Sequence, residues 1–484
     1  MPWRCDMSLP ARLDRLPLSR PHYALLLIGG LGYTFDGMDS AVVAFLMPSA
    51  QQTWHLSNSA LGLIGSASPF GFLFGAATAG LLGDRIGRRK VMMWALAFYA
   101  FFSLVASVSP NYGMFLGSRV LAGAGAGAES AIIAPFLSEF VPAARRGWFV
   151  GALAGFFSFG FVAAALIGRF VVPTLPEGWR IAQMITALPV VMLLLWRRSL
   201  PESPRYLLAR GRHTEAEKVV ADIERQVRKA TGKPLPPVVT EESAPSTAVA
   251  SRPVPGLPAA LRYLWSGEMA RRTAVTWLIW FVITFAYYGF FSWIPTLLVQ
   301  RGITVTKSFE FSIIIYLAQI PGYFSAAWLS ERLDRKNVIA LYLTGSAVSA
   351  FWLSQTTTPV SITLAGVVLS FFLNGTYAGV YSYTPEVFPT WIRATGTGMS
   401  SAFGRVGSIL APTIIGVSAA GFGFVGVFGL TTGVLAIGVI CTLLFGVSTA
   451  GRSLEDLTEP GPGSALPAHA STTTAASEPE VSSR

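Results

Sequence analysis

Twelve long apolar runs, six in each half of the 484-residue chain, constrain its fold more than any other feature. A helix needs roughly 20 apolar residues to cross a bilayer core of about 30 Å, and in lipid it satisfies its own backbone hydrogen bonds. Only 13% of the residues are charged, against about 25% in soluble domains. The sequence therefore excludes a single soluble core and predicts an all-α integral membrane protein. The expected spans are residues 23–47, 58–83, 91–109, 112–138, 147–172, 181–197, 273–299, 310–331, 337–356, 360–384, 396–420 and 423–447.

The polar stretches around the spans divide the chain further. Residues 1–22 carry four Arg and no small-residue cleavage site follows them, which predicts a retained leader instead of a cleaved signal peptide. Residues 203–230 show helical periodicity, and residues 231–258 have the composition of a flexible linker. The expected organisation is a cytoplasmic leader (1–22), a six-helix bundle (23–197), a central loop with amphipathic helices and a linker (198–272), a second six-helix bundle (273–447) and a disordered tail (448–484).

A short charged motif occurs once in each half, each time between two apolar runs. Residues 80–90 read GLLGDRIGRRK and residues 327–337 read AWLSERLDRKN, so an acid, an Arg and a basic pair recur at the same spacing. A second signature follows at a similar distance, because residues 139–146 (EFVPAARR) and 386–393 (EVFPTWIR) share Glu, Pro and Arg at matching positions. The repetition predicts two pseudo-symmetric bundles of six transmembrane helices.

The net charge of +11 follows the loops. Lys and Arg gather in alternate loops, while the loops at 48–57, 110–111 and 357–359 contain none. Positive loops stay cytoplasmic, so both termini and the central loop are expected inside, and a nucleic-acid partner is excluded. The two cysteines, Cys5 and Cys441, have no neighbouring His or Cys, which predicts neither a disulfide nor a zinc site.

Two acidic residues lie deep in the first span, where an ionisable group is costly and is therefore a functional candidate. Asp36 and Asp39 are three residues apart, which puts both on one helix face. Two neighbouring carboxyl groups in a low dielectric favour reversible protonation. The alternative is structural: one Asp caps a helix break at Gly37 or pairs permanently with an Arg.

The fourth span carries both a cation and an acid. Counted from the outer end of each span, at a rise of about 1.5 Å per residue, Arg119 and Asp39 come to a similar depth. We expect them to form an ion pair that weakens when the Asp is protonated; a static salt bridge is the alternative. Glu129 lies roughly three turns further toward the cytoplasm and is expected to extend a proton route. The candidates for proton coupling are Asp36, Asp39, Arg119 and Glu129.

Arg405 is a lone cation in the eleventh span. A guanidinium facing a cavity suits a carboxylate ligand because it is always charged and binds in a bidentate manner. The alternative is that Arg405 pairs with a helix carbonyl or with an Asp or Glu. Tyrosines near the middle of the seventh span and polar groups in later spans are further candidates. The predicted substrate-binding residues are Arg405, Tyr287, Tyr288, Gln319, Asn374, Tyr377 and Tyr381.

Together these residues resemble the major facilitator superfamily over essentially the whole membrane portion. Residues 80–89 are similar to that superfamily's most specific loop motif, and residues 201–205 (PESPR) and 385–393 resemble its sugar-porter and organic-ion branch. Residues 36–39 (DGMD) are similar to the aromatic acid:proton symporters, and the stretch 287–396 resembles bacterial niacin-transporter-type members. The resemblance implies a twelve-helix carrier of two bundles.

The resemblance also implies roles for particular residues. In that branch a first-span Asp and a fourth-span Arg act as a proton-coupling pair, and Asp36 or Asp39 and Arg119 occupy the matching places. Related organic-anion carriers have an eleventh-span Arg, which Arg405 matches.

The expected function is proton-coupled uptake of a small organic carboxylate, such as nicotinate or a benzoate-type acid, by alternating access. The protein is expected to be a monomer of the bacterial cytoplasmic membrane, with no enzymatic activity, cofactor or metal. A sugar porter or a proton-driven exporter of small organic compounds is the alternative. Both rank lower because the seventh span lacks the paired Gln and Asn typical of sugar porters, and residues 148–172 lack the proline typical of exporters.

The repeated loops are expected to act as a cytoplasmic gate. Their acids and arginines would form ion-pair latches that hold the outward-open state and break as the carrier opens inward. The predicted gate residues are Gly80, Asp84, Arg85, Arg88, Arg89, Glu139, Arg146, Glu331, Arg332, Arg335, Glu386 and Arg393.

Overall fold

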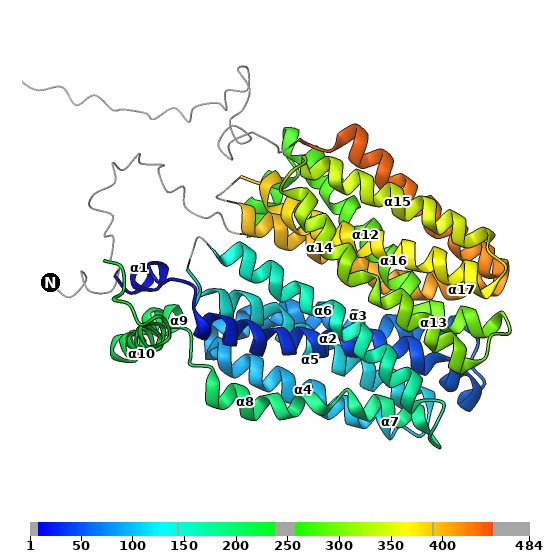
Figure 1. Ribbon diagram of the computed structural model, residues 1–484, viewed down its shortest axis with the longest axis horizontal. Coiled ribbons are helices and arrows are strands. Elements are labelled where there is room, and N and C mark those ends of the chain that lie inside the picture. The colour runs from blue at the N-terminus through cyan, green and yellow to red at the C-terminus, as the bar shows by residue number, and fades with distance from the viewer. Residues whose placement is uncertain (1–7, 143–144, 238–256, 390–391, 449–484) are drawn as a thin grey trace, which may run out of the picture.

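The computed structural model describes residues 8–142, 145–237, 257–389 and 392–448, and within these ranges it contains helices and no strands (Figure 1). The membrane helices of the first half are α2 (Arg20–Trp54), α3 (Asn58–Ile86), α4 (Arg88–Ser107), α5 (Tyr112–Ser138), α6 (Arg146–Val171) and the consecutive α7 (Gly178–Ile185), η2 (Leu188–Val191) and α8 (Met192–Ser199). Those of the second half are α12 (Gly267–Gln300), α13 (Val305–Leu317), α14 (Gln319–Ser330), α15 (Arg335–Gln355), α16 (Pro359–Val387) and α17 (Arg393–Phe445).

These helices make twelve crossings. By length and composition, 10 helical segments of the described ranges are able to cross a membrane, from Asn58–Gly80 to Thr395–Phe445. The last contains 51 residues and breaks at Gly423, whose φ of 60° is not helical, so it counts as two crossings. The twelfth is α2, which is 35 residues long and carries the two intramembrane Asp residues. The structure confirms the predicted all-α membrane fold.

Each half forms one bundle, and the two bundles lie side by side between the same two ends (Figure 1). In the first bundle α2 packs on α6, and α3 packs on α5. Glycines bring α3 and α5 into backbone contact, because a Cβ at Gly71 would clash with the carbonyl of Val120 and one at Gly123 with that of Ser68. Such close approach is how small residues hold membrane helices together.

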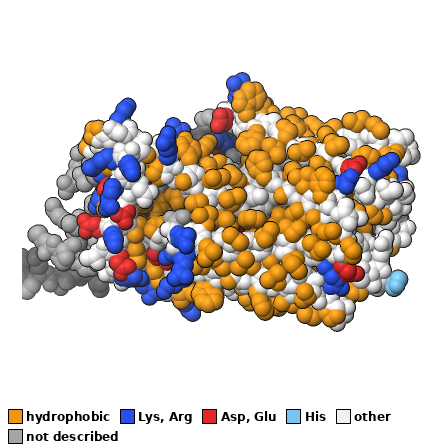
Figure 2. All heavy atoms as spheres, turned by 60° about the horizontal axis from the view of Figure 1, so that its bottom comes forward, with side chains coloured by type: hydrophobic (Ala, Val, Ile, Leu, Met, Phe, Trp, Pro, Cys, Tyr) orange, Lys and Arg blue, Asp and Glu red, His pale blue; other side chains and the backbone are white. Residues whose placement is uncertain are grey.

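The two ends of the molecule differ in charge. Hydrophobic side chains cover the middle of the surface in Figure 2, and Lys and Arg gather at the ends, most densely at one of them. We call this the basic end; it carries α1 (Ser8–Asp14), α9 (Pro204–Ala209) and α10 (His213–Thr231). The opposite end carries the connections at 55–57, 108–111 and 301–304. The apolar belt has the form expected of a surface in contact with lipid.

The two halves are joined near the opposite end. There α3 packs closely on α17: the Ser66 hydroxyl donates to the Ile409 carbonyl at 2.5 Å and lies 2.9 Å from the Thr413 hydroxyl. Further contacts near this end are the Arg169–Glu310 ion pair (2.8 Å) and the Gln300–Asn58 hydrogen bond (3.0 Å). Toward the basic end, the Tyr323 hydroxyl donates to the Gly151 carbonyl at 3.3 Å.

A small helical cap covers the basic end of the first bundle. Arg12 and Arg15, on and just after α1, hold Glu224 of α10 at 2.7 and 2.6 Å, and Leu9 and Leu13 of α1 are buried. The Asp14 carboxylate pairs with Arg146 at the start of α6 (2.6 Å). The helical periodicity of residues 203–230 thus belongs to α9 and α10, while the expected tail (448–484) lies almost entirely outside the described residues.

One detail differs from the sequence-based expectation. The eighth span is not one continuous helix, because α13 and α14 meet at Ala318. An amphipathic helix of the central loop, α11 (Leu257–Leu264), follows the expected linker and ends before α12 begins at Gly267, a glycine with a positive φ of 50°. That left-handed conformation favours glycine and marks the change of direction.

Candidate functional site

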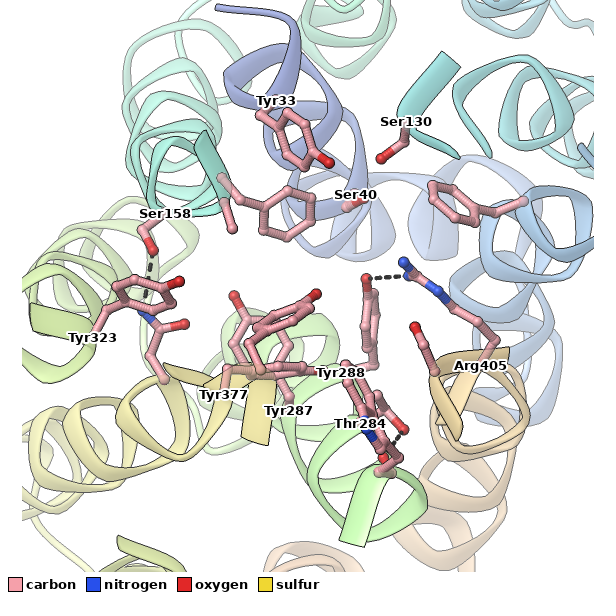
Figure 3. Close-up of a pocket in the computed structure, with 17 residues that line it drawn as sticks. Tyr33, Ser40, Ser130, Ser158, Thr284, Tyr287, Tyr288, Tyr323, Tyr377 and Arg405 are labelled. Atoms are coloured by element: carbon pink, nitrogen blue, oxygen red, sulfur yellow. Dashed lines mark hydrogen bonds between the residues drawn. The ribbon is translucent and has the colours of Figure 1, made fainter. Parts of the chain in front are cut away.

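A cavity lies between the two halves, near the middle of the membrane helices. The space among its lining atoms is ≈ 760 Å³, a value that includes the part open to solvent. Helices α2, α3, α5 and α6 line it from one side, and α12, α14, α16 and α17 from the other (Figure 3). The lining residues are Tyr33, Ser40, Phe72, Ser130, Ala154, Phe157, Ser158, Trp280, Thr284, Tyr287, Tyr288, Tyr323, Asn374, Tyr377, Tyr381, Ser401 and Arg405.

Arg405 supplies the positive charge of this cavity. Its guanidinium donates to the Tyr288 hydroxyl at 3.4 Å, and its central carbon lies 4.1 Å from the centroid of the Phe72 ring, which belongs to the other half. Among the described residues no Asp or Glu forms an ion pair with Arg405. Arg405 therefore does not neutralise an acid among these residues, and its guanidinium is available to bind an anion.

Aromatic rings form the wall beside Arg405. Tyr287 and Tyr377 meet edge to face with centroids 5.1 Å apart, Trp280 meets Tyr381 at 5.2 Å, and Tyr377 and Tyr381 stack at 6.1 Å. The Tyr381 side chain is 46% exposed, toward the cavity. Rings in this arrangement present flat faces and hydroxyl groups to the same space.

Two of the predicted contacts hold the wall in place. Gln319 does not line the cavity; it is fully buried and accepts a hydrogen bond from the Tyr287 hydroxyl at 2.7 Å. The Asn374 amide does line the cavity, and it donates to the Gln319 carbonyl at 2.7 Å and to the Ser158 hydroxyl of the first half at 3.0 Å. Gln319 therefore lies behind the cavity wall, and its side-chain oxygen holds the Tyr287 hydroxyl in place.

Arg119 and Asp39 form a buried ion pair. The guanidinium contacts the Asp39 carboxylate at 2.6 Å and donates to its backbone carbonyl at 3.2 Å, and both side chains are almost inaccessible to solvent. The similar depths inferred from the sequence correspond to a direct contact. Asp36 and Glu129, by contrast, lie beside each other between α2 and α5, and neither forms an ion pair within the described residues.

The predicted gate residues lie at the basic end, and their ion pairs join helices of one half. Arg88 pairs with Glu139, which also accepts a hydrogen bond from Ser203. In the second half Arg335 pairs with Glu386 at 2.9 Å. Pairs inside one bundle do not need to break when the two bundles move, so they brace each half. Their predicted role as latches of the outward-open state stays a prediction.

The remaining predicted gate residues have varied surroundings. Arg89 donates to the Arg197 carbonyl at 2.6 Å, and the Arg332 guanidinium lies 4.0 Å from the centroid of the Trp328 ring. Arg85 and Glu331 are exposed, Arg393 is half-buried, and a Cβ at Gly80 would meet nothing. The Asp84 side chain lies outside what the structure describes.

Several residues of the cavity and of the basic end have no counterpart in the sequence-based prediction, among them Asp14, Ser203, Tyr33 and Ser130. Asp14 ends the short helix α1 and Ser203 caps the short helix α9, and their partners lie far away in the chain. Tyr33 and Ser130 line the cavity next to the buried acids. Their signal in the sequence was their position, three residues before Asp36 and directly after Glu129.

Two six-crossing bundles around a central cavity define a transporter of the major facilitator type. The family described as sugar (and other) transporter matches residues 28–460, and the chain belongs to that family. The resemblance found in the residues is thereby confirmed, and the protein is a multi-pass inner-membrane transporter and not an enzyme.

Relatives and solved structures agree with this placement. The niacin transporter NiaP of Acinetobacter baylyi is 38% identical over 93% of this chain and 100% of its own length. The 4-hydroxybenzoate transporter PcaK of Pseudomonas putida is 29% identical over 84% of this chain and 88% of its own. The inward-open xylose transporter XylE of E. coli superposes with a TM-score of 0.71 over 90% of this chain and 99% of its own, at 18% identity, which shows the shared fold.

Proposed function

We propose that this transporter carries small aromatic carboxylates, of the nicotinate or benzoate type, into the cell together with protons. The observation that supports this most is Arg405, a cation without an acidic partner among the described residues, in a cavity walled by aromatic rings. The names of the relatives, a niacin transporter and a 4-hydroxybenzoate transporter, describe ligands of this class.

The carboxylate would bind at Arg405. A guanidinium in a partly dehydrated site is costly unless a negative charge accompanies it, and a planar carboxylate matches its fork of N–H donors. The Tyr288 hydroxyl, 3.4 Å from the guanidinium, is placed to donate to the same carboxylate. Phe72 on the opposite half contacts the guanidinium, so a bound anion would touch both bundles at once.

The ring of the substrate would lie against the tyrosine wall. Offset-stacked and edge-to-face aromatic pairs contribute about 0.5–1.5 kcal/mol beyond area burial. Trp280, Tyr377 and Tyr381 offer both geometries within one cavity. A hexose has no aromatic ring to stack on this wall and no negative charge to pair with Arg405, which places sugar uptake second.

Transport would proceed by alternating access, with the basic end and both termini in the cytoplasm as the charge distribution indicates. In the structure the halves are joined near the opposite end through Ser66, Ile409 and Thr413. Opening that end while closing the basic end would expose the cavity to the outside. Intramembrane carboxyl groups on α2 and α5 would couple this motion to protons.

Uptake by vesicles tests the proposal. Membrane vesicles containing the full chain are given an imposed pH gradient, acid outside, and a panel of labelled nicotinate, benzoate, 4-hydroxybenzoate, acetate and glucose. We expect accumulation of the aromatic carboxylates and little of acetate or glucose. Accumulation competed by hexoses and not by benzoate would support the sugar porter instead. Substrate extrusion without accumulation would support the exporter.

A further inference from the structure

The first bundle contains a second pair of intramembrane acids besides the ion-paired Asp39. Asp36 on α2 is 5% exposed and Glu129 on α5 is 1% exposed, and the two carboxyl groups lie beside each other. Asp36 Oδ2 and Glu129 Oε1 are buried without a hydrogen-bond partner in the described part of the chain. Such unpartnered oxygens are rare in buried groups and ask for a physical explanation.

The neighbouring Asp39 is in a different electrostatic state. Arg119 contacts its carboxylate at 2.6 Å and is itself fully buried, so each charge neutralises the other. Gln183 accepts a further hydrogen bond from Arg119 at 3.5 Å. Removing one charge from a buried ion pair leaves the other charge uncompensated, which is strongly destabilising. Asp39 therefore already has a counter-charge within the membrane.

Within the described ranges of the chain, no cation compensates Asp36 or Glu129 in this way. The titratable groups around them are Asp39 and Tyr33 on the same helix α2 and Tyr99 on α4, none of which carries a positive charge. Gly32 of α2 and Trp196 of α8 enclose the Glu129 carboxyl, since a Cβ at Gly32 would lie 2.9 Å from Glu129 Oε1 and 3.2 Å from Trp196. A buried carboxyl without a cation is stable when a proton neutralises it.

Two hydroxyl groups lie between this acid pair and the cavity. Ser130 follows Glu129 in the chain and lies beside Asp36, and Tyr33 precedes Asp36 by one helical turn. Both line the cavity, and in Figure 3 their hydroxyls point toward each other at its edge. Each hydroxyl is able to accept one proton and donate its own, so the two connect the acids to cavity water.

We propose that the Asp36–Glu129 carboxyl pair, and not the Asp39–Arg119 ion pair, takes up and releases the coupled proton, through the hydroxyls of Tyr33 and Ser130. The inference rests on the proposed function. On loading, a hydronium ion in the cavity gives its proton to a carboxylate oxygen of the pair and becomes water. On unloading, the O–H bond breaks and the proton returns to cavity water.

The arrangement couples the proton to an anionic substrate. While the pair is protonated, the cavity keeps the full positive field of Arg405, and a carboxylate binds there. Release of the proton leaves a buried negative charge behind Tyr33 and Ser130 of the cavity wall, and like charges in a low dielectric repel each other. Proton release after opening toward the basic end would therefore promote release of the anion.

Proteoliposomes of the full chain loaded with nicotinate separate the two pairs. Asp36→Asn and Glu129→Gln mimic the protonated pair, so we expect counterflow exchange within about threefold of wild type. We expect accumulation driven by a pH gradient to fall to the equilibrium level in the same variants. Asp39→Asn leaves Arg119 unpaired, and we expect it to lower exchange and accumulation together. Tyr33→Phe and Ser130→Ala should slow gradient-driven uptake more than exchange.

The opposite pattern overturns the assignment. If Asp36→Asn and Glu129→Gln accumulate nicotinate like wild type, while Asp39→Asn exchanges but does not accumulate, then Asp39 carries the proton. Infrared difference spectra of the wild-type protein provide a readout independent of any variant. We expect the carbonyl band of a protonated carboxyl at neutral pH, and its absence contradicts the inference. Failure of wild type to accumulate any carboxylate would instead refute the proposed function.

Discussion

At the scale of single residues, charge balance distinguishes the groups inside the membrane. Asp39 and Arg119 neutralise each other within 2.6 Å. Arg405 has a hydroxyl and an aromatic ring as neighbours but no acidic partner among the described residues. An intramembrane charge without a counter-charge is expected to have a functional reason. For Arg405 that reason is an anionic ligand.

Replacing Arg405 by Gln should weaken binding of aromatic carboxylates. Loss of a hydrogen bond to a charged group costs about 1.5–3 kcal/mol, which corresponds to a KM for nicotinate higher by roughly 10- to 150-fold. Arg301→Gln is the matched control, because that guanidinium also faces an aromatic ring, Phe424 at 4.1 Å, but lies outside the cavity. Equal KM values for both variants in vesicle uptake would remove Arg405 from the binding site.

Adding a methyl group at Gly32 should disturb Glu129. The new Cβ would lie 2.9 Å from Glu129 Oε1 and 2.9 Å from Ile133, so the carboxyl must shift. We expect Gly32→Ala to reduce gradient-driven accumulation several-fold more than exchange. Gly117→Ala, on the same helix as Glu129 and with nothing within 4 Å, should leave both unchanged. Identical behaviour of the two variants would argue against a tightly packed carboxyl site.

The sequence was informative about residues where depth alone decides the contact. Helical rise was enough to bring Arg119 level with Asp39, and the structure has them in contact. The sequence was less informative about contacts that depend on which face of a helix a side chain occupies. Gln319 was predicted on the cavity surface, yet it lies behind Tyr287, because a single sequence does not specify which face of α14 points inward.

At the scale of elements, the cap of α1 and α10 depends on one carboxylate. Burial alone would raise the pKa of Glu224, but hydrogen bonds from Arg12 and Arg15 outweigh it and hold the pKa below its usual value. A carboxylate whose pKa is lowered stabilises the fold only while it is ionised. This stabilisation is present above the ordinary Glu pKa of about 4.3 and is lost as the pH falls through the lowered pKa.

Glu224→Gln should therefore weaken the docking of α1 on α10 at neutral pH. Protonation of Glu224 at low pH should have the same effect in the wild type. We expect a loss of about 1–2 kcal/mol in docking, seen as a longer distance between spin labels on α1 and α10. Glu217→Gln is the control. The Glu217 side chain is 69% exposed and its carboxylate lies as far as 3.9 Å from Arg12, and exposed pairs contribute about 0–1 kcal/mol. A short distance in Glu224→Gln at pH 7 would contradict this role.

Element boundaries were predictable to the extent that apolar periodicity marks them. The spans at 112–138 and 360–384 correspond closely to α5 and α16. The docking of α1 was not predictable, because it arises from contacts with a segment far away in the chain. Glu224 is 209 residues from Arg15, a separation that no local pattern reports.

At the scale of the whole molecule, the repeat predicted two similar bundles but not how they meet. The structure has one conformation, joined near the opposite end through α3 and α17. A sequence with pseudo-symmetry is equally compatible with the halves joined at either end. Which end is closed depends on small differences between two ways of packing the bundles against each other. Transport by alternating access would need both of these arrangements.

Covalent closure of the opposite end should stop transport. The side-chain oxygens of Ser66 and Thr413 are 2.9 Å apart, so cysteines at both positions should form a disulfide in this conformation. We expect oxidised Ser66→Cys/Thr413→Cys to lose uptake and exchange, with recovery after reduction. Each single cysteine variant serves as the control. Full transport by the oxidised double variant would contradict a required opening at that end.

Simultaneous recording of nicotinate and proton fluxes tests the central claim most directly. Purified wild-type protein in proteoliposomes, without an imposed gradient, is given external nicotinate while a dye reports the external pH. Proton-coupled uptake predicts that the medium becomes more alkaline as label enters, and that a proton ionophore abolishes the pH change. Entry of nicotinate with no proton movement, or with acidification of the medium, would contradict the account.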